Sequence, residues 1–241
     1  MYGSLNMIEI YAVNLRKIKE YVDGKIIQLS SERLQQINSL HHGKKKGSFI
    51  AEQIVHFYMK SIRKIDKYSI VIDNNGKPKF LNVPNLNFNI SHSGDWVFCA
   101  FSDFEIGIDV ERIEDAKMNI AKKYYNKLEY EKLNCIDNVM ERNELFYLLW
   151  TLKESYLKNM GMSIGMLSPK IRFEIGNKIN GYVSEKKIDK LFFSQKFDNN
   201  YYLSLCYEKV ETLSEKKYIN IIDNAQIEVI TKEEADNEYG V

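Results

Sequence analysis

The chain has 241 residues, 44% of them hydrophobic and 28% charged, which excludes a disordered or fibrous protein. Its 34 basic residues nearly balance its 33 acidic residues, so a dedicated nucleic-acid-binding protein is not expected. The three cysteines are an odd number without metal-ligand spacing, which indicates a reducing compartment. The longest apolar run, Leu145–Trp150, is far shorter than the roughly 20 residues that span a bilayer, and no signal-peptide core opens the chain. We therefore expect a soluble, cytoplasmic protein without a membrane or nucleic-acid partner.

The first half of the chain predicts a strand, a long helix and a hairpin. Residues 7–13 are apolar and strand-forming, and a Ser-Ser-Glu segment at 30–32 marks a helix start. Apolar residues then recur at helical spacing over residues 44–64. A run of turn residues at 73–78 precedes two strands over residues 87–101, which a Ser-Gly-Asp turn joins.

The second half predicts a central strand, a long helix and further strands. Residues 106–111 alternate apolar and polar side chains, as a half-buried strand does, and residues 113–135 are expected to be helical with a loop. The segment from Glu144 to Asn159 is the strongest predicted helix, and Gly161 ends it. The later predicted strands are Ile171–Ile175, Gly181–Val183, Leu191–Phe197, Tyr201–Tyr207 and an apolar run at Tyr218–Ile222.

The order of a helix followed by strands occurs twice. The helix at 44–64 precedes strands that end at 101, and the helix at 144–159 precedes strands that end at 207. This repetition predicts an α+β fold of two similar domains, residues 1–105 and 106–241.

A pair of carboxylates lies on the predicted central strand. Asp109 and Glu111 are two residues apart, so both side chains point to one face. Two carboxylates this close repel each other unless a cation or a proton lies between them, and hard oxygen ligands suit Mg²⁺. The alternative is a solvated strand face, which shows the same alternation.

A second motif, residues 150–158, places Glu154 and Lys158 one helical turn apart on a shared face. In the functional interpretation, Glu154 completes a metal site and Lys158 contacts a phosphate. In the alternative, the two residues form an ordinary exposed ion pair that contributes about 0.3–0.5 kcal/mol.

A third motif, residues 89–94, places His92 among small polar residues at the end of a strand. Backbone amides and an imidazole in such a segment can hold a phosphate, and the alternative is a turn with one surface histidine. The basic run Lys44–Lys46 is either a solvated face or a clamp for a terminal phosphate.

In this order and at these separations, the three motifs resemble the Sfp-type 4′-phosphopantetheinyl transferases. The family pattern of Ser-His-Ser, then Gly-Ile-Asp-(Ile/Val)-Glu, then Trp-x-x-Lys-Glu-x-x-x-Lys is matched by residues 91–93, 107–111 and 150–158. Residues 76–78 also match the family's Gly-Lys-Pro turn. Each motif alone is weak, and the ordered set is specific.

The resemblance implies a pseudo-twofold pair of α+β domains with coenzyme A bound in the cleft between them. It also implies Mg²⁺-dependent transfer of the 4′-phosphopantetheine arm from coenzyme A to a serine of an apo acyl or peptidyl carrier protein. Adenosine 3′,5′-bisphosphate would be released. Fatty-acid, polyketide and non-ribosomal peptide carriers remain equally open. Because two domains making one complete cleft need no second copy, we expect a monomer.

The resemblance also assigns roles to residues. The implied ligands of Mg²⁺ are Asp109, Glu111 and Glu154. Glu154 is the first candidate for the base that accepts the serine proton, and a metal-bound water is the second. The implied contacts to coenzyme A are at the diphosphate (His92 and Lys158, which add positive charge for catalysis), the nucleotide end (Lys77 and Ser91) and the 3′-phosphate (Ser48).

The sequence departs from the family near the 3′-phosphate. The family often has two lysines in its first helix, and the corresponding segment 31–36 keeps only Arg33. Arg33 and Lys46 are therefore the expected basic contacts at this end of coenzyme A.

Two other functions are open from the sequence. One is a different Mg²⁺-dependent phosphoryl-transfer enzyme, such as a nucleotide hydrolase, that uses the same three carboxylates. The other is a non-catalytic module that binds coenzyme A or a carrier protein. Residues 122–128 combine basic and aromatic side chains, so they are either a docking segment for the carrier or an ordinary amphipathic surface helix.

Overall fold

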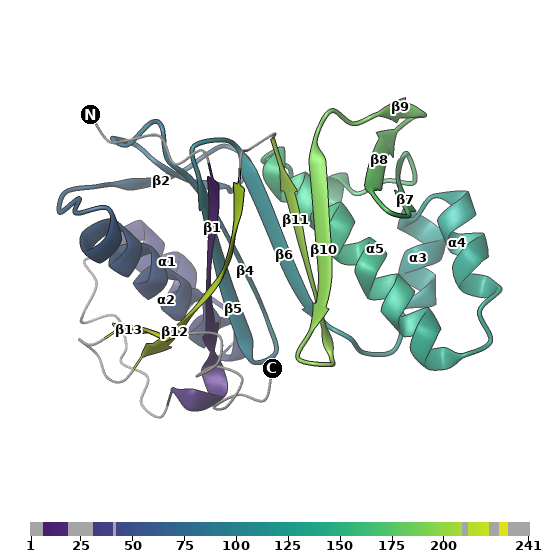
Figure 1. The fold of residues 1–241 in the computed structure, drawn as a ribbon, viewed down its shortest axis with the longest axis horizontal. Helices are drawn as coiled ribbons and strands as arrows, with labels where there is room; N and C mark the ends of the chain where they lie inside the picture. Colours follow the sequence, from purple (N-terminus) through teal and green to yellow (C-terminus); the bar gives the residue numbers. More distant parts are fainter. Residues whose placement is uncertain (1–6, 19–30, 41, 209–211, 222–226, 231–241) are drawn as a thin grey trace.

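The computed structural model describes residues 7–18, 31–40, 42–208, 212–221 and 227–230 (Figure 1). The helices are α1 (Ser31–Asn38), α2 (His42–Phe57), α3 (Met118–Tyr124), α4 (Lys127–Asn134) and α5 (Val139–Asn159), with short helical turns at Leu15–Lys17, Tyr58–Ile62 and Ile164–Met166. The strands of the first half are β1 (Met7–Asn14), β2 (Ile70–Ile72), β3 (Pro78–Phe80), β4 (Asn87–Ser93) and β5 (Trp96–Ser102). Those of the second half are β6 (Ile106–Arg112), β7 (Ile171–Ile175), β8 (Ile179–Val183), β9 (Lys186–Lys187), β10 (Leu191–Phe197), β11 (Tyr201–Tyr207), β12 (Thr212–Ile221) and β13 (Ile227–Ile230).

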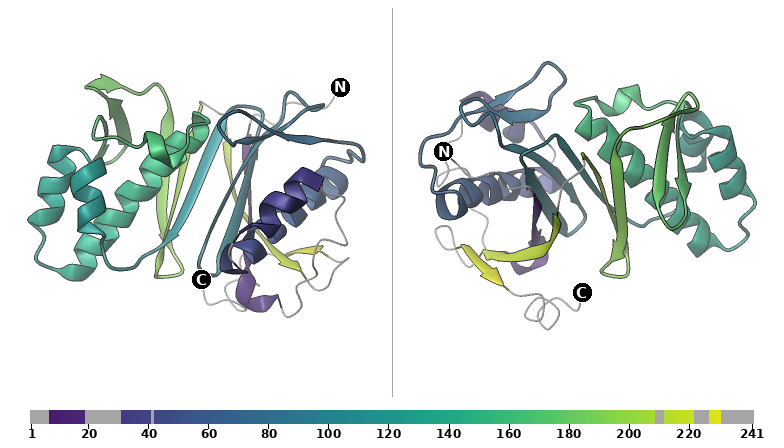
Figure 2. Two further views of the ribbon diagram at one scale, coloured as in Figure 1. Left: turned by 180° about the vertical axis from the view of Figure 1, so that it is seen from behind. Right: turned by 45° about the horizontal axis from the view of Figure 1, so that its top comes forward.

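Two main sheets face each other, with helices on their outer sides (Figures 1 and 2). One sheet has the strand order β13-β12-β1-β5-β4 and the other has the order β10-β11-β6. Buried apolar side chains fill the space between the sheets, among them Ile10 and Phe98 from the first and Ile108 and Leu205 from the second. Helix α2 covers the outer face of the first sheet, and α5 covers that of the second. The predicted α+β class is confirmed.

The last described strands return to the first sheet. β12 pairs in parallel with β1, and β13 pairs with β12. The division of the chain at Glu105 into two similar domains therefore stays a prediction, because a segment from beyond this boundary completes the sheet of the first half. Ser30 and Ile222, at the ends of two predicted elements, lie outside the described residues.

Helix α5 begins five residues earlier than the sequence predicts. The prediction starts at Glu144, where the apolar stripe becomes visible, but the helix begins at Val139. The side chain of Asn138 accepts hydrogen bonds from the amides of Met140 and Glu141 and so caps the first turn. The apolar side chains of this turn, Val139 and Met140, are exposed, so the first turn adds nothing to a buried stripe.

Strand β6 is buried on both faces, so the prediction of a half-buried strand is wrong. All residues from Ile106 to Val110 are buried. One face packs in the core between the sheets, and the other lies under α5. The reason for the close approach is Gly107, where an added Cβ would lie 2.0 Å from the Ser155 carbonyl oxygen of α5. The polar side chain of Asp109 is consequently enclosed rather than solvated.

The two sheets meet along one edge, where β4 lies beside β6. Side chains form this seam. The backbone amides of β6 donate hydrogen bonds to polar side chains at alternate positions of β4, where in a continuous sheet they would bond to backbone carbonyl groups. The three bonds run from Ile108 N to Asn89 Oδ1 at 2.9 Å, from Val110 N to Ser91 Oγ at 3.1 Å and from Arg112 N to Ser93 Oγ at 3.1 Å. Since the donors are buried or half-buried amides, each bond satisfies a group that would be costly to leave unpaired.

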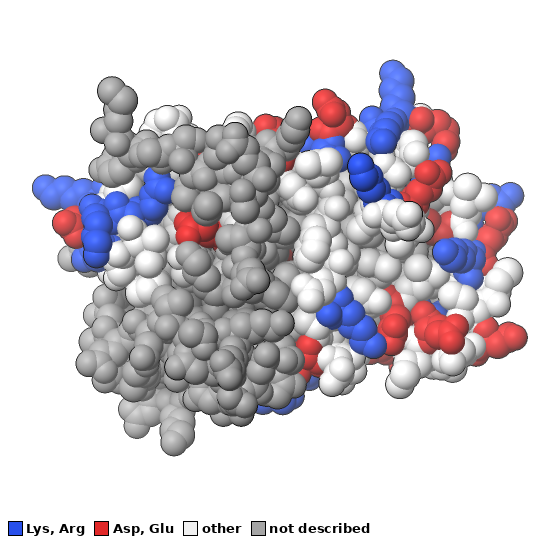
Figure 3. Space-filling model, in the orientation of Figure 1, with Lys and Arg blue, Asp and Glu red and all other residues white. Residues whose placement is uncertain are grey.

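The face of the molecule that Figure 3 shows is mixed in charge where its residues are described. Charged side chains of both signs gather over the half that holds α3, α4 and α5, and the surface over β10 and β11 is largely uncharged (Figure 3). Among the described residues, no helix has the length and the apolar character that a membrane crossing requires.

Candidate active site

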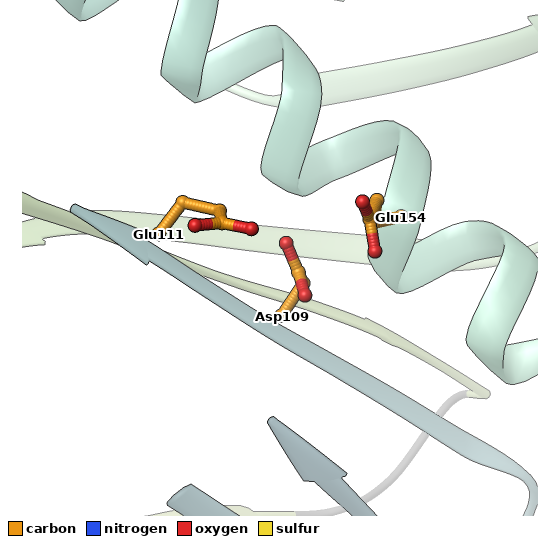
Figure 4. Close-up of side chains that lie close together, drawn as sticks. All are labelled: Asp109, Glu111 and Glu154. Carbon is orange, nitrogen blue, oxygen red and sulfur yellow. The ribbon is translucent and has the colours of Figure 1, made fainter. Parts of the chain in front are cut away.

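Three carboxylates converge where β6 passes under α5. Asp109 and Glu111 come from the strand and Glu154 comes from the helix (Figure 4). Each offers an oxygen, and these oxygens all lie within 4.8 Å of one another. Residues far apart in the sequence therefore form one acidic cluster, which the two-residue spacing on β6 and the close packing at Gly107 bring together.

Asp109 is the most enclosed member of the cluster, with 1% of its surface exposed. Its Oδ1 accepts hydrogen bonds from Ser91 Oγ at 2.9 Å and from Lys158 Nζ at 2.7 Å. Its Oδ2 is buried and has no hydrogen-bond partner within the part of the chain that the structure describes. A buried carboxylate oxygen without a donor is costly unless a cation satisfies it, so the donor set fits a hard divalent cation.

Glu111 is half-buried and is held by Ser93, whose Oγ donates to Glu111 Oε2 at 2.7 Å. Burial raises the pKa of Asp109. Burial and then the negative charge of Asp109 raise the pKa of Glu111 to about 7. Burial is the main cause of both shifts, and the repulsion between neighbouring carboxylates that the sequence suggests contributes to the shift of Glu111.

Lys158 crosses from α5 to the strand and pairs with Asp109 at 2.7 Å. Its Nζ also donates to Ser91 Oγ at 3.0 Å. Although burial acts against the charged form, the carboxylates of Asp109 and Glu154 raise the pKa of Lys158. A fixed ammonium group therefore stands beside the carboxylates, and it is not merely the outer half of an exposed helical ion pair with Glu154.

His92 and Ser48 lie together at the end of β4. Ser48 Oγ is 3.4 Å from His92 Nε2, and the ring packs against Gly47, where an added Cβ would lie 2.9 Å from His92 Cγ. Ser48 is buried and His92 is half-buried. The structure thus brings two of the predicted coenzyme A contacts together.

The two contacts predicted at the nucleotide end lie in different places. Ser91 is bonded to Asp109 within the cluster, whereas Lys77 is held at the start of β6. Lys77 Nζ donates to Glu105 Oε2 at 2.6 Å and to the carbonyl oxygens of Ile106 and Asn159, so it joins the start of β6 to the end of α5. Burial lowers the pKa of Lys77, although the carboxylate of Glu105 opposes this.

Of the two basic residues predicted at the 3′-phosphate, the structure describes the side chain of Lys46 but not that of Arg33. Lys46 Nζ donates to the carbonyl oxygens of Leu15 at 2.9 Å and Ile18 at 3.3 Å. Arg33 belongs to α1, and its side chain lies outside the described part of the structure. The roles of both residues stay predictions.

The sequence analysis missed Lys153, the lysine directly before Glu154. Its side chain is fully buried and pairs with Glu129 Oε2 at 2.7 Å. Glu129 also accepts hydrogen bonds from the backbone amides of Phe173 and Asn126. The pair therefore fixes α5 against α4 and β7 immediately next to a cluster residue. The available signal was the position of this lysine within the Trp-x-x-Lys-Glu motif.

A shallow pocket that is open to solvent adjoins the cluster at Glu111. Its apolar wall includes Phe146 and Trp150 of α5, whose rings stack at 6.1 Å between centroids, and Ile120 of α3. Its polar wall includes Glu111 and Lys117. The cluster thus opens onto a space that both apolar and charged side chains line.

Comparison with known proteins identifies the family. The family model "4′-phosphopantetheinyl transferase superfamily" matches residues 105–206. The chain is 40% identical over 109 residues to 4′-phosphopantetheinyl transferase Sfp of Bacillus subtilis (strain 168), covering 45% of this chain and 47% of that protein. It is 32% identical over 174 residues to 4′-phosphopantetheinyl transferase gsp of Aneurinibacillus migulanus, covering 69% of this chain and 71% of that protein. The chain belongs to the 4′-phosphopantetheinyl transferase family.

The matched region is a part of each relative. The alignment with the Bacillus subtilis protein spans about half of that protein's length, 47%. A solved structure, that of Thermotoga maritima holo-[acyl-carrier-protein] synthase, aligns with 48% of this chain and 66% of its own at 21% identity and a TM-score of 0.35.

Proposed function

We propose that this protein transfers the 4′-phosphopantetheine arm of coenzyme A to a serine of an apo acyl or peptidyl carrier protein and releases adenosine 3′,5′-bisphosphate. The observation that carries the proposal is the convergence of Asp109, Glu111 and Glu154 beside the ammonium group of Lys158. Family membership supports the same reaction.

The chemistry of this reaction needs such a cluster. The serine hydroxyl attacks a phosphorus atom of a diphosphate, where negative charge hinders approach and increases on the leaving group. Mg²⁺ held by the three carboxylates would neutralise that charge. Lys158 supplies a second positive charge beside the carboxylates, which favour its charged form. His92, at the end of β4, is the third candidate for a positive group that stabilises the diphosphate.

The proton of the attacking serine needs an acceptor. Glu154 is our first choice, because it belongs to the cluster and, on its helix, faces Asp109 and Glu111 from the opposite side (Figure 4). A water molecule bound to the cation is the alternative acceptor.

The pocket beside Glu111 gives the arm a place to lie. A diphosphate at the carboxylates would have one substituent next to this pocket, whose wall of Phe146, Trp150 and Ile120 suits the apolar parts of a pantetheine chain. We propose that the arm enters there and that the serine approaches from the open side.

Intact-mass spectrometry tests the proposed transfer. The protein is incubated with Mg²⁺, coenzyme A and several apo carrier proteins from fatty-acid, polyketide and non-ribosomal peptide systems. We expect at least one carrier to gain the phosphopantetheine mass, and none to do so when its acceptor serine is changed to alanine. Release of adenosine 3′,5′-bisphosphate without any carrier would instead favour a hydrolase. Binding of coenzyme A without either product would favour a non-catalytic module.

Cation affinity should rise with pH through neutrality. In the metal-free protein the pKa of Glu111 is about 7, so below that pH a cation must displace a proton to bind. If one proton is displaced, the cation affinity falls about tenfold for each pH unit below the pKa of Glu111. Above that pKa the cation affinity no longer depends on pH. Calorimetric titration with Mg²⁺ at pH 6 and pH 8 in buffers of different ionisation enthalpy measures both the affinity and the proton release. An affinity that is equal at both pH values, without proton release, would contradict this expectation.

Charge reversal at the end of α3 should weaken the use of the carrier. Lys122 and Lys123 are both exposed, and exposed Leu128 follows on α4, so the segment offers basic and apolar contacts to an acidic carrier helix. We expect the double variant Lys122→Glu/Lys123→Glu to raise the KM for the carrier severalfold and to leave the Kd for coenzyme A unchanged. Steady-state kinetics against carrier concentration measure the first value and calorimetry measures the second.

The matched control for this variant is Lys186→Glu/Lys187→Glu, an exposed lysine pair on β9. If both double variants raise the KM equally, the effect is general electrostatic attraction, and α3 is not the docking segment.

A further inference from the structure

The serine that follows His92 has no role in the reaction as described so far. Ser93 ends β4, and its hydroxyl makes two hydrogen bonds: it accepts from the amide of Arg112 at 3.1 Å and donates to Glu111 Oε2 at 2.7 Å. A serine hydroxyl has a single hydrogen to donate. The Arg112 amide points at the Ser93 oxygen, so the hydrogen of the hydroxyl must point elsewhere. It points toward Glu111, and the bond from the Arg112 amide therefore fixes the direction in which the hydroxyl donates.

The seam between the sheets is thus connected to the carboxylate cluster. Arg112 is the residue after Glu111 on β6, so Ser93 holds both the backbone that follows Glu111 and the end of its side chain. A glutamate has several rotatable bonds, and without such a bond its carboxylate would lose orientation before a cation binds. Figure 4 shows the Glu111 carboxylate directed toward Asp109.

We propose that Ser93 is a positioning residue that orients Glu111 for cation binding. The inference rests on the proposed cation site, and it adds that the seam between the two sheets determines how tightly the site binds. Ser91 makes the same pair of bonds, to the Val110 amide and to Asp109. Its hydroxyl also accepts from Lys158, so a change at Ser91 would disturb two groups of the site at once. A change at Ser93 therefore tests the positioning of one carboxylate, that of Glu111, without also disturbing Lys158.

Asn89 provides a matched control in the same seam. It accepts the Ile108 amide at 2.9 Å, as Ser93 accepts the Arg112 amide, and its described hydrogen bonds include none to a carboxylate. Replacing Asn89 with alanine therefore removes one seam bond without touching the cluster. A purely structural effect of the seam would appear in both variants, and a positioning effect would appear only at Ser93.

The test is Mn²⁺ binding to the full chain without coenzyme A, measured by the loss of the free-ion signal in electron paramagnetic resonance. Ser93→Ala should weaken Mn²⁺ binding by about 10- to 100-fold, the usual effect of losing a hydrogen bond to a metal ligand. Ser93→Thr keeps the hydroxyl and should bind as the unchanged protein does. Asn89→Ala should lower the melting temperature and leave the Mn²⁺ affinity unchanged.

If Ser93→Ala fails to fold, Ser93→Cys replaces it, because a thiol has the same connectivity as the hydroxyl, leaves no cavity and is only a weak hydrogen-bond donor. Mn²⁺ affinity that is equal in the unchanged protein and in the Ser93 variants would overturn the inference and leave the cation site intact. An equal loss in Asn89→Ala would also overturn it, because the effect would then be structural. No Mn²⁺ binding to the unchanged protein would overturn the cation site and, with it, this inference.

Discussion

Replacing Glu154 with glutamine should lower the turnover number for carrier modification by about 10²- to 10⁴-fold, the usual contribution of a general base. The substitution keeps the shape of the side chain but removes its negative charge and its ability to accept a proton. The Kd for coenzyme A should change much less, because Asp109 and Glu111 still offer carboxylates to a cation and Lys158 keeps its pair with Asp109. Formation of the holo carrier measures turnover, and calorimetry measures coenzyme A binding.

The same substitution earlier on α5 provides the control. Glu144 is half-buried and pairs with Lys196 at 2.6 Å, a partner that belongs to β10 rather than to the cluster. Glu144→Gln should leave turnover unchanged. If Glu154→Gln weakened coenzyme A binding as much as turnover, Glu154 would be a ligand only and the base would be another group.

Replacing Lys153 with methionine should lower the free energy of unfolding by about 3–5 kcal/mol, because it leaves the buried carboxylate of Glu129 without its counter-charge. Glu129 would keep the amide hydrogen bonds from Phe173 and Asn126, so we expect destabilisation rather than a new fold. Urea unfolding followed by circular dichroism measures the change.

Lys127→Met is the matched comparison on the surface. Lys127 pairs with Glu131 at 3.8 Å, and their side chains are 85% and 54% exposed. An exposed pair of this kind contributes at most about 1 kcal/mol. If Lys153→Met cost no more than Lys127→Met, the buried pair would not be what holds α5 in place.

Most helices and strands follow from local patterns that do not depend on tertiary contacts. The hairpin β4–β5 has a recognisable Ser-Gly-Asp turn, and the stripe of α5 is visible from Glu144 onward. The start of α5 at Val139 was missed because its signal is a cap, Asn138, followed by exposed apolar residues.

The burial of β6 could not be predicted from its alternation. A polar residue at every second position usually indicates a solvated face, and here that face lies under α5. Whether Asp109 is solvated or enclosed depends on a helix that approaches closely at Gly107, which is a tertiary property.

The membership of the acidic cluster was predicted from motif order, but the supports around it were not. A lysine on a helix is normally exposed, so nothing in the composition identifies Lys153 as buried. The donor role of Ser93 likewise requires β4 to lie beside β6, and strands of different sheets are not paired by any local pattern.

A crystal structure with Mn²⁺ and coenzyme A would show whether the three carboxylates share one cation. We predict a single anomalous peak about 2 Å from an oxygen of each of Asp109, Glu111 and Glu154, with diphosphate oxygens completing the coordination. A peak held by residues outside this cluster, or coenzyme A bound with its diphosphate away from it, would contradict the proposed site.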